Sequence, residues 1–141
     1  MANEELIAKG MEMRRILVGK VMADKLDREV YTDPHMQKFS ELFNELIFSQ
    51  VWPRGVIDLK TRTLITMISD ATAGAHDALA LHVRFCRIHG WSEDEIIECF
   101  IHLTAYIGIP LVRKAILVAS KTFQEMRDNG ELPVEATAAG E

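Results

Sequence analysis

Cysteine is scarce in this sequence, and that scarcity excludes a fold built on disulfides. Only two cysteines occur among 141 residues, Cys86 and Cys99, and each lies within an apolar pattern of helical period. Such surroundings are typical of reduced, buried thiols rather than of a disulfide framework. The sequence also lacks the C-x-x-C and H-E-x-x-H motifs of common metal sites, so we expect no bound metal.

Clusters of lysine and arginine are missing as well. The chain has 16 basic and 21 acidic residues, a formal net charge of -5 and a pI near 5.5, so we expect no nucleic-acid partner. No apolar run approaches the length of a membrane span. The opening residues, MANEELIAKG, lack the basic start and apolar core of a signal peptide. The sequence therefore predicts a cytoplasmic protein with no membrane partner.

Helical patterning dominates what is present. With 48% hydrophobic residues, a chain of this length fits one globular domain. No strand-like alternation of period two occurs, so we expect an all-α, single-domain bundle of about six helices. Residues 1–130 are predicted to form the domain, and the small, alanine-rich segment 131–141 is predicted to be disordered. The expected helices cover residues 4–22, 34–48, 58–73, 75–89, 93–107 and 110–128.

Local signals mark several helix ends. Asp33 followed by Pro34 is typical of an N-cap and a first helical position, and Asp58 is a second candidate N-cap. Ser92 with Glu95 three residues later indicates a capping box. These signals place the ends of the predicted helices independently of the apolar pattern.

Polar residues within the apolar helices are the candidate functional groups. They raise the possibility of a polar pocket between helices, and they are His76, His82, His89, His102, Tyr106 and Arg113. His89, just before Gly90, fits a helix C-terminus, where an imidazolium complements the dipole. From the residues alone His82 is either a core histidine or a catalytic one, and Trp52 is either a packing residue or part of a site. The residues by themselves predict only a helical domain with a possible histidine site.

Four blocks of the sequence resemble a known family. GMEMRRILVG, VWPRGVIDLKTRTLIT, LALHVRFCRIHG and IHLTAYIGIP are similar, in order and spacing, to the carboxymuconolactone decarboxylase family. The resemblance spans roughly residues 8–126. It implies an all-helical subunit that assembles into rings of three or six, with active sites near the subunit contacts.

The resemblance also implies a set of site residues. His82 matches the family's histidine, the candidate for proton transfer, and Arg54 matches the pocket loop as a second catalytic residue. Four residues are implied in substrate binding, and they are Gln50, Trp52, Arg62 and Tyr106. Two positions depart from the family pattern, because Gln50 and Ala78 stand where the decarboxylase usually has glutamates. These departures change the charge and the acid–base capacity of the pocket.

The related alkylhydroperoxidase D branch uses a C-x-x-C motif ahead of its histidine. Here the matching positions are Ala75 and Ala78, so the thiol chemistry of that branch has no nucleophile. We therefore expect no peroxidase activity.

The resemblance implies a cofactor-independent decarboxylase, of the kind used in the catabolism of aromatic compounds. Its substrate would be a small carboxylated lactone or oxo-acid that reacts through an enolate, with His82 as proton donor and acceptor. No cofactor is expected, because such a substrate carries its own electron sink. The alternatives are an isomerase or a hydratase on a related acid, or a non-catalytic oligomeric binding protein.

Overall fold

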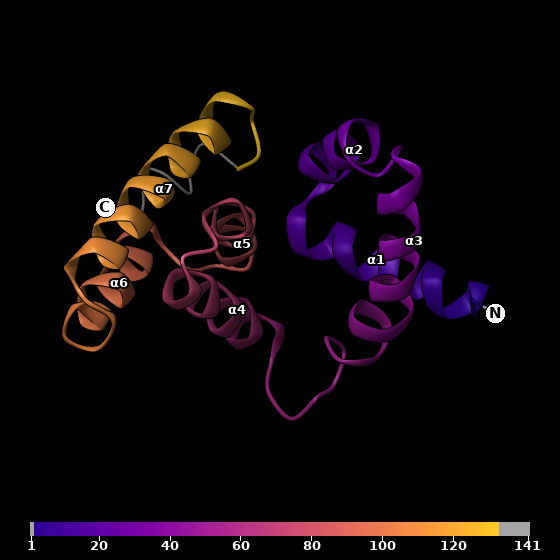
Figure 1. Cartoon of the computed structure of the whole chain (residues 1–141), viewed down its shortest axis with the longest axis horizontal. Helices are drawn as coiled ribbons and strands as arrows, with labels where there is room; N and C mark the ends of the chain where they lie inside the picture. Colours follow the sequence, from indigo (N-terminus) through magenta and orange to yellow (C-terminus); the bar gives the residue numbers. More distant parts are fainter. Residues whose placement is uncertain (1, 133–141) are drawn as a thin grey trace. The chain divides into compact units, whose positions relative to one another are not determined.

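The computed structural model describes residues 2–132, and every regular element in this range is helical (Figure 1). The predicted all-α fold is confirmed. The elements are α1 (Glu4–Val18), α2 (Lys20–Glu29), α3 (Pro34–Phe43), the short π-helix η1 (Asn44–Phe48), α4 (Leu59–Ala73), α5 (His76–Ile88), α6 (Glu93–Ile107) and α7 (Ile109–Asp128).

Contacts within the chain gather the helices into two compact units, Met1–Leu59 and Lys60–Glu141. Helices α1 to α3 and η1 belong to the first unit, and α4 begins at the boundary and continues through the second. The single domain expected for residues 1–130 stays a prediction. Most of the segment predicted to be disordered, residues 133–141, lies outside the described residues.

The prediction of one helix over residues 4–22 was wrong. Asn3 caps α1 by accepting the N–H of Leu6 at 3.1 Å, and α1 ends at Gly19, whose φ of 82° and ψ of 159° change the direction of the chain. Glycine adopts this backbone conformation at no steric cost, whereas residues with a Cβ atom are disfavoured at positive φ. Helix α2 then begins at once with Lys20. The apolar pattern continues across the break, which is why it does not reveal the break.

In the first unit, α1 packs most extensively against η1. The contact is close at Gly10, where a Cβ atom would lie 2.1 Å from the carbonyl oxygen of Asn44. Arg14, on the same helix and 9% exposed, places its guanidinium 4.7 Å from the ring centroid of Tyr31 and 5.3 Å from that of Phe43. Cation–π contacts of this kind stabilise a charge that is shielded from water. Gly10 and Arg14 thus fix α1 against the segment that leads to the Trp52 loop.

Gly10→Ala is expected to destabilise the protein by about 1 to 3 kcal/mol, because the added methyl group would overlap the backbone of Asn44 rather than a movable side chain. Urea unfolding followed by circular dichroism measures the change. Gly55→Ala is the matched control, since a Cβ atom at Gly55 meets nothing within 4 Å. Equal midpoints for the two variants would contradict the tight contact between α1 and η1.

In the second unit, α7 packs against both α5 and α6. Each helix contributes an apolar face to the core. The buried residues of the core include Met67 from α4, Val83 from α5, Phe100 from α6 and Phe123 from α7. The predicted capping box at the start of α6 is confirmed, because Ser92 and Glu95 exchange side-chain and backbone hydrogen bonds. Helix α6 is therefore fixed in register from its first turn.

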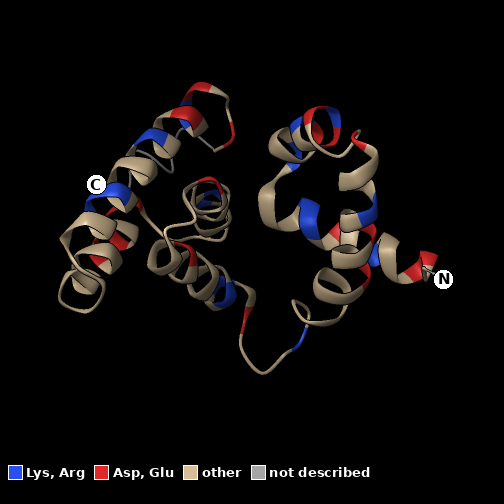
Figure 2. Cartoon of the chain, in the orientation of Figure 1, with Lys and Arg blue, Asp and Glu red and all other residues tan. Residues whose placement is uncertain are grey.

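An ionic cluster centred on buried Arg84 joins α5 to the end of α7, with Glu131 buried and Glu125 44% exposed. Arg84 has only 6% of its side chain exposed, and its Nη2 lies 3.0 Å from Glu125 Oε2 while its Nε lies 3.1 Å from Glu131 Oε1. The side chain of Glu131 is 3% exposed, so both members of that pair are shielded from water. Basic and acidic residues both occur along the described helices (Figure 2), and the first turn of α6 holds three acidic residues in a row, Glu93, Asp94 and Glu95.

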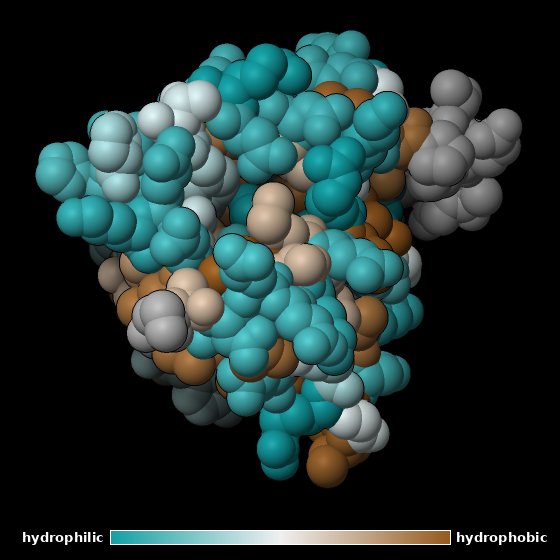
Figure 3. All heavy atoms as spheres, turned by 90° about the vertical axis from the view of Figure 1, so that its right-hand side faces the viewer, coloured by the Kyte–Doolittle hydropathy of each residue, from teal (hydrophilic) through white to brown (hydrophobic). Residues whose placement is uncertain are grey.

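Apolar side chains also reach the surface of the first unit. Figure 3, viewed from the side of α1 to α3, shows atoms of apolar residues among polar ones. Phe39 and Leu42 on α3 are each 54% exposed, and Leu46 and Ile47 on η1 are 46% and 43% exposed. Phe39, Leu42 and Leu46 follow the i, i+3, i+7 spacing of one helix face.

Candidate active site

One predicted site residue, His82, lies in the second unit beside an acidic residue of another helix. His82 is on α5, and its Nδ1 atom contacts Oδ2 of Asp70, which is on α4. The side chains are 18% and 13% exposed, so the pair is largely shielded yet reachable. The ring of Phe85 meets the imidazole edge to face, with the centroids 4.8 Å apart. The result is an imidazole held between a carboxylate and an aromatic ring.

Asp70 is not among the candidate residues that the sequence singled out. Asp70 and His82 are 12 positions apart on different helices, so no local spacing links them. One signal was available. Asp70 is an acidic residue within LITMISDA, a mostly apolar stretch of α4. Its neighbours on that helix, Met67 and Ala71, are buried. A carboxylate at such a position requires a partner.

Arg62 and Tyr106 also belong to the second unit. Arg62 lies on α4, the helix that carries Asp70, and is partly buried. Tyr106 lies near the end of α6, is 74% exposed, and stacks on His102 with the ring centroids 5.4 Å apart. The exposed phenol is therefore available at the surface of this unit.

The other three predicted residues belong to the first unit, in and just before the loop that follows η1. Trp52 is 7% exposed and stacks in parallel on Phe48, with the centroids 6.0 Å apart. Most of its indole surface is thus used in packing. Arg54 is exposed and its backbone N–H donates to the carbonyl of Val51 at 3.2 Å, while Nε2 of Gln50 donates to the carbonyl of Glu45 at 2.9 Å. Residues 51–58 are non-helical, in keeping with the gap between the predicted helices 34–48 and 58–73. The catalytic role of Arg54 and the binding roles of Gln50 and Trp52 stay predictions.

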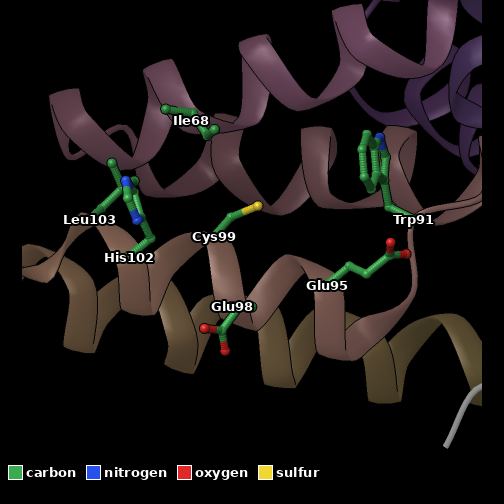
Figure 4. Close-up of a pocket in the computed structure, with 7 residues that line it drawn as sticks. All are labelled: Ile68, Trp91, Glu95, Glu98, Cys99, His102 and Leu103. Atoms are coloured by element: carbon green, nitrogen blue, oxygen red, sulfur yellow. The ribbon is translucent and has the colours of Figure 1, made fainter.

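A pocket of about 370 Å³ lies between α4 and α6 (Figure 4). Its lining residues are mostly apolar, and they are Ile68, Trp91, Glu95, Glu98, Cys99, His102 and Leu103. The indole N–H of Trp91 donates to the carbonyl of Lys60 at 2.8 Å, and the Lys60 ammonium lies 4.4 Å from the indole centroid. In Figure 4 the side chain of Glu98 points away from the other lining residues. His82 is not part of this lining, although His102, the stacking partner of Tyr106, is.

The thiols are poorly suited to nucleophilic chemistry. Burial raises the pKa of Cys86 to about 12. Burial, with the charges of Glu95 and Glu98, also raises the pKa of Cys99. A thiol is a nucleophile only as its thiolate, so both cysteines stay largely unreactive near neutral pH.

We expect Cys86 to resist alkylation in the native protein. Because its pKa is about 12, almost none of it is thiolate near pH 8, whereas partly buried Cys99 is more accessible. Iodoacetamide should label Cys99 before Cys86, and mass spectrometry of the peptides gives the order. In denaturant the two rates should converge. Faster labelling of Cys86 than of Cys99 in the native protein would contradict the assignment.

His89 occupies the C-cap of α5, as its position before Gly90 predicted. Within residues 2–132 no three side chains of His, Cys, Asp or Glu gather as a metal site would require. None of the helices in that range combines the length and apolarity that crossing a membrane would need.

The helices and the imidazole–carboxylate pair define an all-helical protein with a candidate acid–base site. Comparison with known protein families identifies the family, because residues 37–121 match the model of the carboxymuconolactone decarboxylase family. The chain belongs to that family, and the resemblance noted in the sequence is confirmed.

Two relatives cover nearly the whole chain. The chain is 25% identical to a 4-carboxymuconolactone decarboxylase of Acinetobacter baylyi over 126 aligned residues. The aligned stretch covers 89% of this chain and 92% of that protein. It is 30% identical to a nitrosuccinic acid decarboxylase of Metarhizium robertsii over 129 aligned residues, and this stretch covers 92% of this chain and 89% of that protein. Both relatives are thus named as decarboxylases, of different acids.

Proposed function

We propose that the protein is a cofactor-independent decarboxylase of small organic acids, with His82 as the group that delivers and recovers a proton. The observation that carries the proposal is the imidazole of His82 beside the carboxylate of Asp70. Membership of a family with two relatives named as decarboxylases supports the same reaction class.

The reaction makes two demands on the protein. Loss of carbon dioxide breaks a carbon–carbon bond and leaves the electron pair on the substrate, where a conjugated acceptor group carries it as an oxyanion. Positive potential beside that oxygen lowers the barrier, and we assign this role to Arg54, with Gln50 as a neutral donor. The carbanionic carbon then takes a proton from His82, and the imidazole regains a proton from water. Atoms and charge balance with one proton consumed from solvent.

Substrate binding is assigned to Trp52, Arg62 and Tyr106. Trp52 offers the 7% of its surface that packing leaves exposed, Arg62 offers a cation for a second carboxylate, and Tyr106 offers an exposed phenol. We propose these roles because the positions match the family blocks. An arginine at this position would also favour acids with more than one anionic group.

The names of the two relatives suggest the class of substrate. One is named for a carboxymuconolactone and the other for nitrosuccinic acid. A conjugated carbonyl and a nitro group can both accept the electron pair that a departing carboxylate leaves behind. We therefore propose a small acid whose leaving carboxylate is bonded to a carbon next to, or conjugated with, such an acceptor.

Two neutral residues bear on the choice among reactions. By the resemblance of the sequence blocks, Gln50 and Ala78 stand where the decarboxylase usually has glutamates, so less acid–base capacity comes from those positions. The proposed site then relies on His82 and Asp70. An isomerase or hydratase would use the same imidazole through the same kind of anion, and a binding protein would use it only to hold a ligand.

The experiment is a screen of small lactone, oxo and nitro acids against the purified protein, with carbon dioxide release and product mass as readouts. Release of carbon dioxide that disappears in His82→Ala supports decarboxylation. Products of unchanged mass identify an isomerase, and a mass increase of one water identifies a hydratase. Binding of these acids without turnover identifies the non-catalytic alternative.

We propose in addition that the protein is a homo-oligomer of three or six chains. The four exposed apolar side chains on α3 and η1 support this, because three of them share the spacing of one helix face and exposed apolar faces commonly mark protein–protein contacts. Light scattering at micromolar concentration is expected to give the mass of a trimer or a hexamer. Leu42→Glu should lower that mass, and a monomeric wild-type protein would refute the assembly.

A further inference from the structure

We infer that Asp70 is a positioning residue that holds the proton of neutral His82 on Nδ1 and so leaves Nε2 as the atom that exchanges protons with substrate. This inference rests on the proposed function for its catalytic consequence. The tautomer itself is a property of the protein and can be measured without any substrate.

The contact is specific to one ring nitrogen. Oδ2 of Asp70 meets Nδ1 of His82, and an ionised carboxylate only accepts hydrogen bonds. Nδ1 must therefore carry the hydrogen, which makes Nε2 the unprotonated nitrogen of the neutral ring. The ring of Phe85 on the same helix, 4.8 Å from the imidazole centroid, restricts ring rotation further.

Cys86, which is also on α5, does not compete for this hydrogen. Burial, and to a smaller extent the charge of nearby Asp70, raises the pKa of the Cys86 thiol to about 12, so the thiol is neutral near pH 7. The carboxylate of Asp70 is 13% exposed, so water weakens the contact less than it would at the surface. The hydrogen bond to Nδ1 is thus the main interaction that selects the tautomer among the described contacts of the ring.

The catalytic consequence follows from the tautomer. In the protonated imidazole, Nε2 carries the second hydrogen and donates it to the carbon from which carbon dioxide has left. The ring then returns to the Nδ1–H form and regains a proton at Nε2 from water. Asp70 does not change protonation in this cycle, because it accepts the same hydrogen bond throughout and stabilises the imidazolium.

The experiment is nitrogen NMR of the full-length protein labelled with ¹⁵N-histidine. The signal of His82 among the five histidines is assigned by its loss in His82→Gln. The wild-type neutral ring is expected to carry its proton on Nδ1. Asp70→Asn should shift the ring toward the Nε2–H form, since an amide can donate to Nδ1, while Asp70→Glu should keep the Nδ1–H form.

Ser69→Ala is the matched control, because Ser69 neighbours Asp70 on α4 but is exposed, and its hydroxyl donates to the carbonyl of Thr66 at 2.8 Å. It should leave the His82 signals unchanged. A wild-type ring protonated on Nε2, or an unchanged tautomer in folded Asp70→Asn, would overturn the inference. If Asp70→Asn fails to fold, the wild-type tautomer still decides the question.

Activity provides the second readout. Asp70→Asn should lower kcat by about tenfold or more with KM largely unchanged, and Asp70→Glu should restore part of kcat, because the tautomer matters in the chemical step rather than in binding. A wild-type protein with the Nδ1–H tautomer but without turnover of any acid refutes the proposed decarboxylase and leaves the positioning role intact. A normal kcat in Asp70→Asn with an altered tautomer refutes the catalytic part of the inference.

Discussion

His82→Ala is expected to lower kcat by about a hundredfold or more on the substrate identified in the screen, with KM almost unchanged. The imidazole is assigned to proton delivery after carbon dioxide leaves, and loss of a positioned general acid or base costs about 10² to 10⁴ in rate. Steady-state kinetics of the variant against the wild type measures the effect. Turnover at the wild-type rate would reduce His82 to a packing residue that pairs with Asp70.

Arg54→Ala is the comparison that gives this result its meaning. Arg54 is assigned to the developing oxyanion and, as a cation, also to a substrate carboxylate, so its loss should raise KM and lower kcat by less than His82→Ala does. A charged hydrogen bond is worth about 1.5 to 3 kcal/mol. The two variants should therefore differ in which kinetic constant changes, and identical profiles would contradict the separate roles.

Arg84→Ala is expected to cost about 3 to 5 kcal/mol in the free energy of unfolding, the largest stability effect that we predict. The change leaves Glu131, with 3% of its side chain exposed, as a buried carboxylate without its guanidinium partner. Urea unfolding measures the loss.

Lys9→Ala provides the control for that measurement. Lys9 pairs with Glu5 at 3.4 Å, but both side chains are exposed, at 61% and 80%. Surface pairs of this kind contribute between zero and about 1 kcal/mol. Similar losses in Arg84→Ala and Lys9→Ala would show that the cluster between α5 and α7 is not shielded from water as described.

Features of the fold that depend on neighbouring residues were predictable. Asp33 and Pro34 begin α3, and Ser92 with Glu95 caps α6, because a cap is made within three or four residues of its own helix. The break at Gly19 was not predictable from the apolar pattern, since that pattern reports which face is buried and not the backbone angles.

The candidate site was predictable only in part, for a related reason. His82 stood out because a polar residue interrupts an apolar helix face and matches a family block. Its partner Asp70 comes from another helix, and only the packing of α4 against α5 brings them together. Pairing of this kind depends on tertiary contacts that no sequence spacing encodes.

The two tryptophans give each unit its own optical signal. Trp52 lies in the unit of residues 1–59 and Trp91 in that of residues 60–141, and the sequence holds no others. Indole emission shifts to longer wavelength when the ring enters water, so it reports the unfolding of the unit that holds the ring. Trp52→Phe leaves only the emission of Trp91, and Trp91→Phe leaves only that of Trp52. Melting curves of the two variants that coincide indicate one cooperative transition, whereas separate curves indicate units that unfold independently. The effect of Gly10→Ala could then be followed within its own half of the chain.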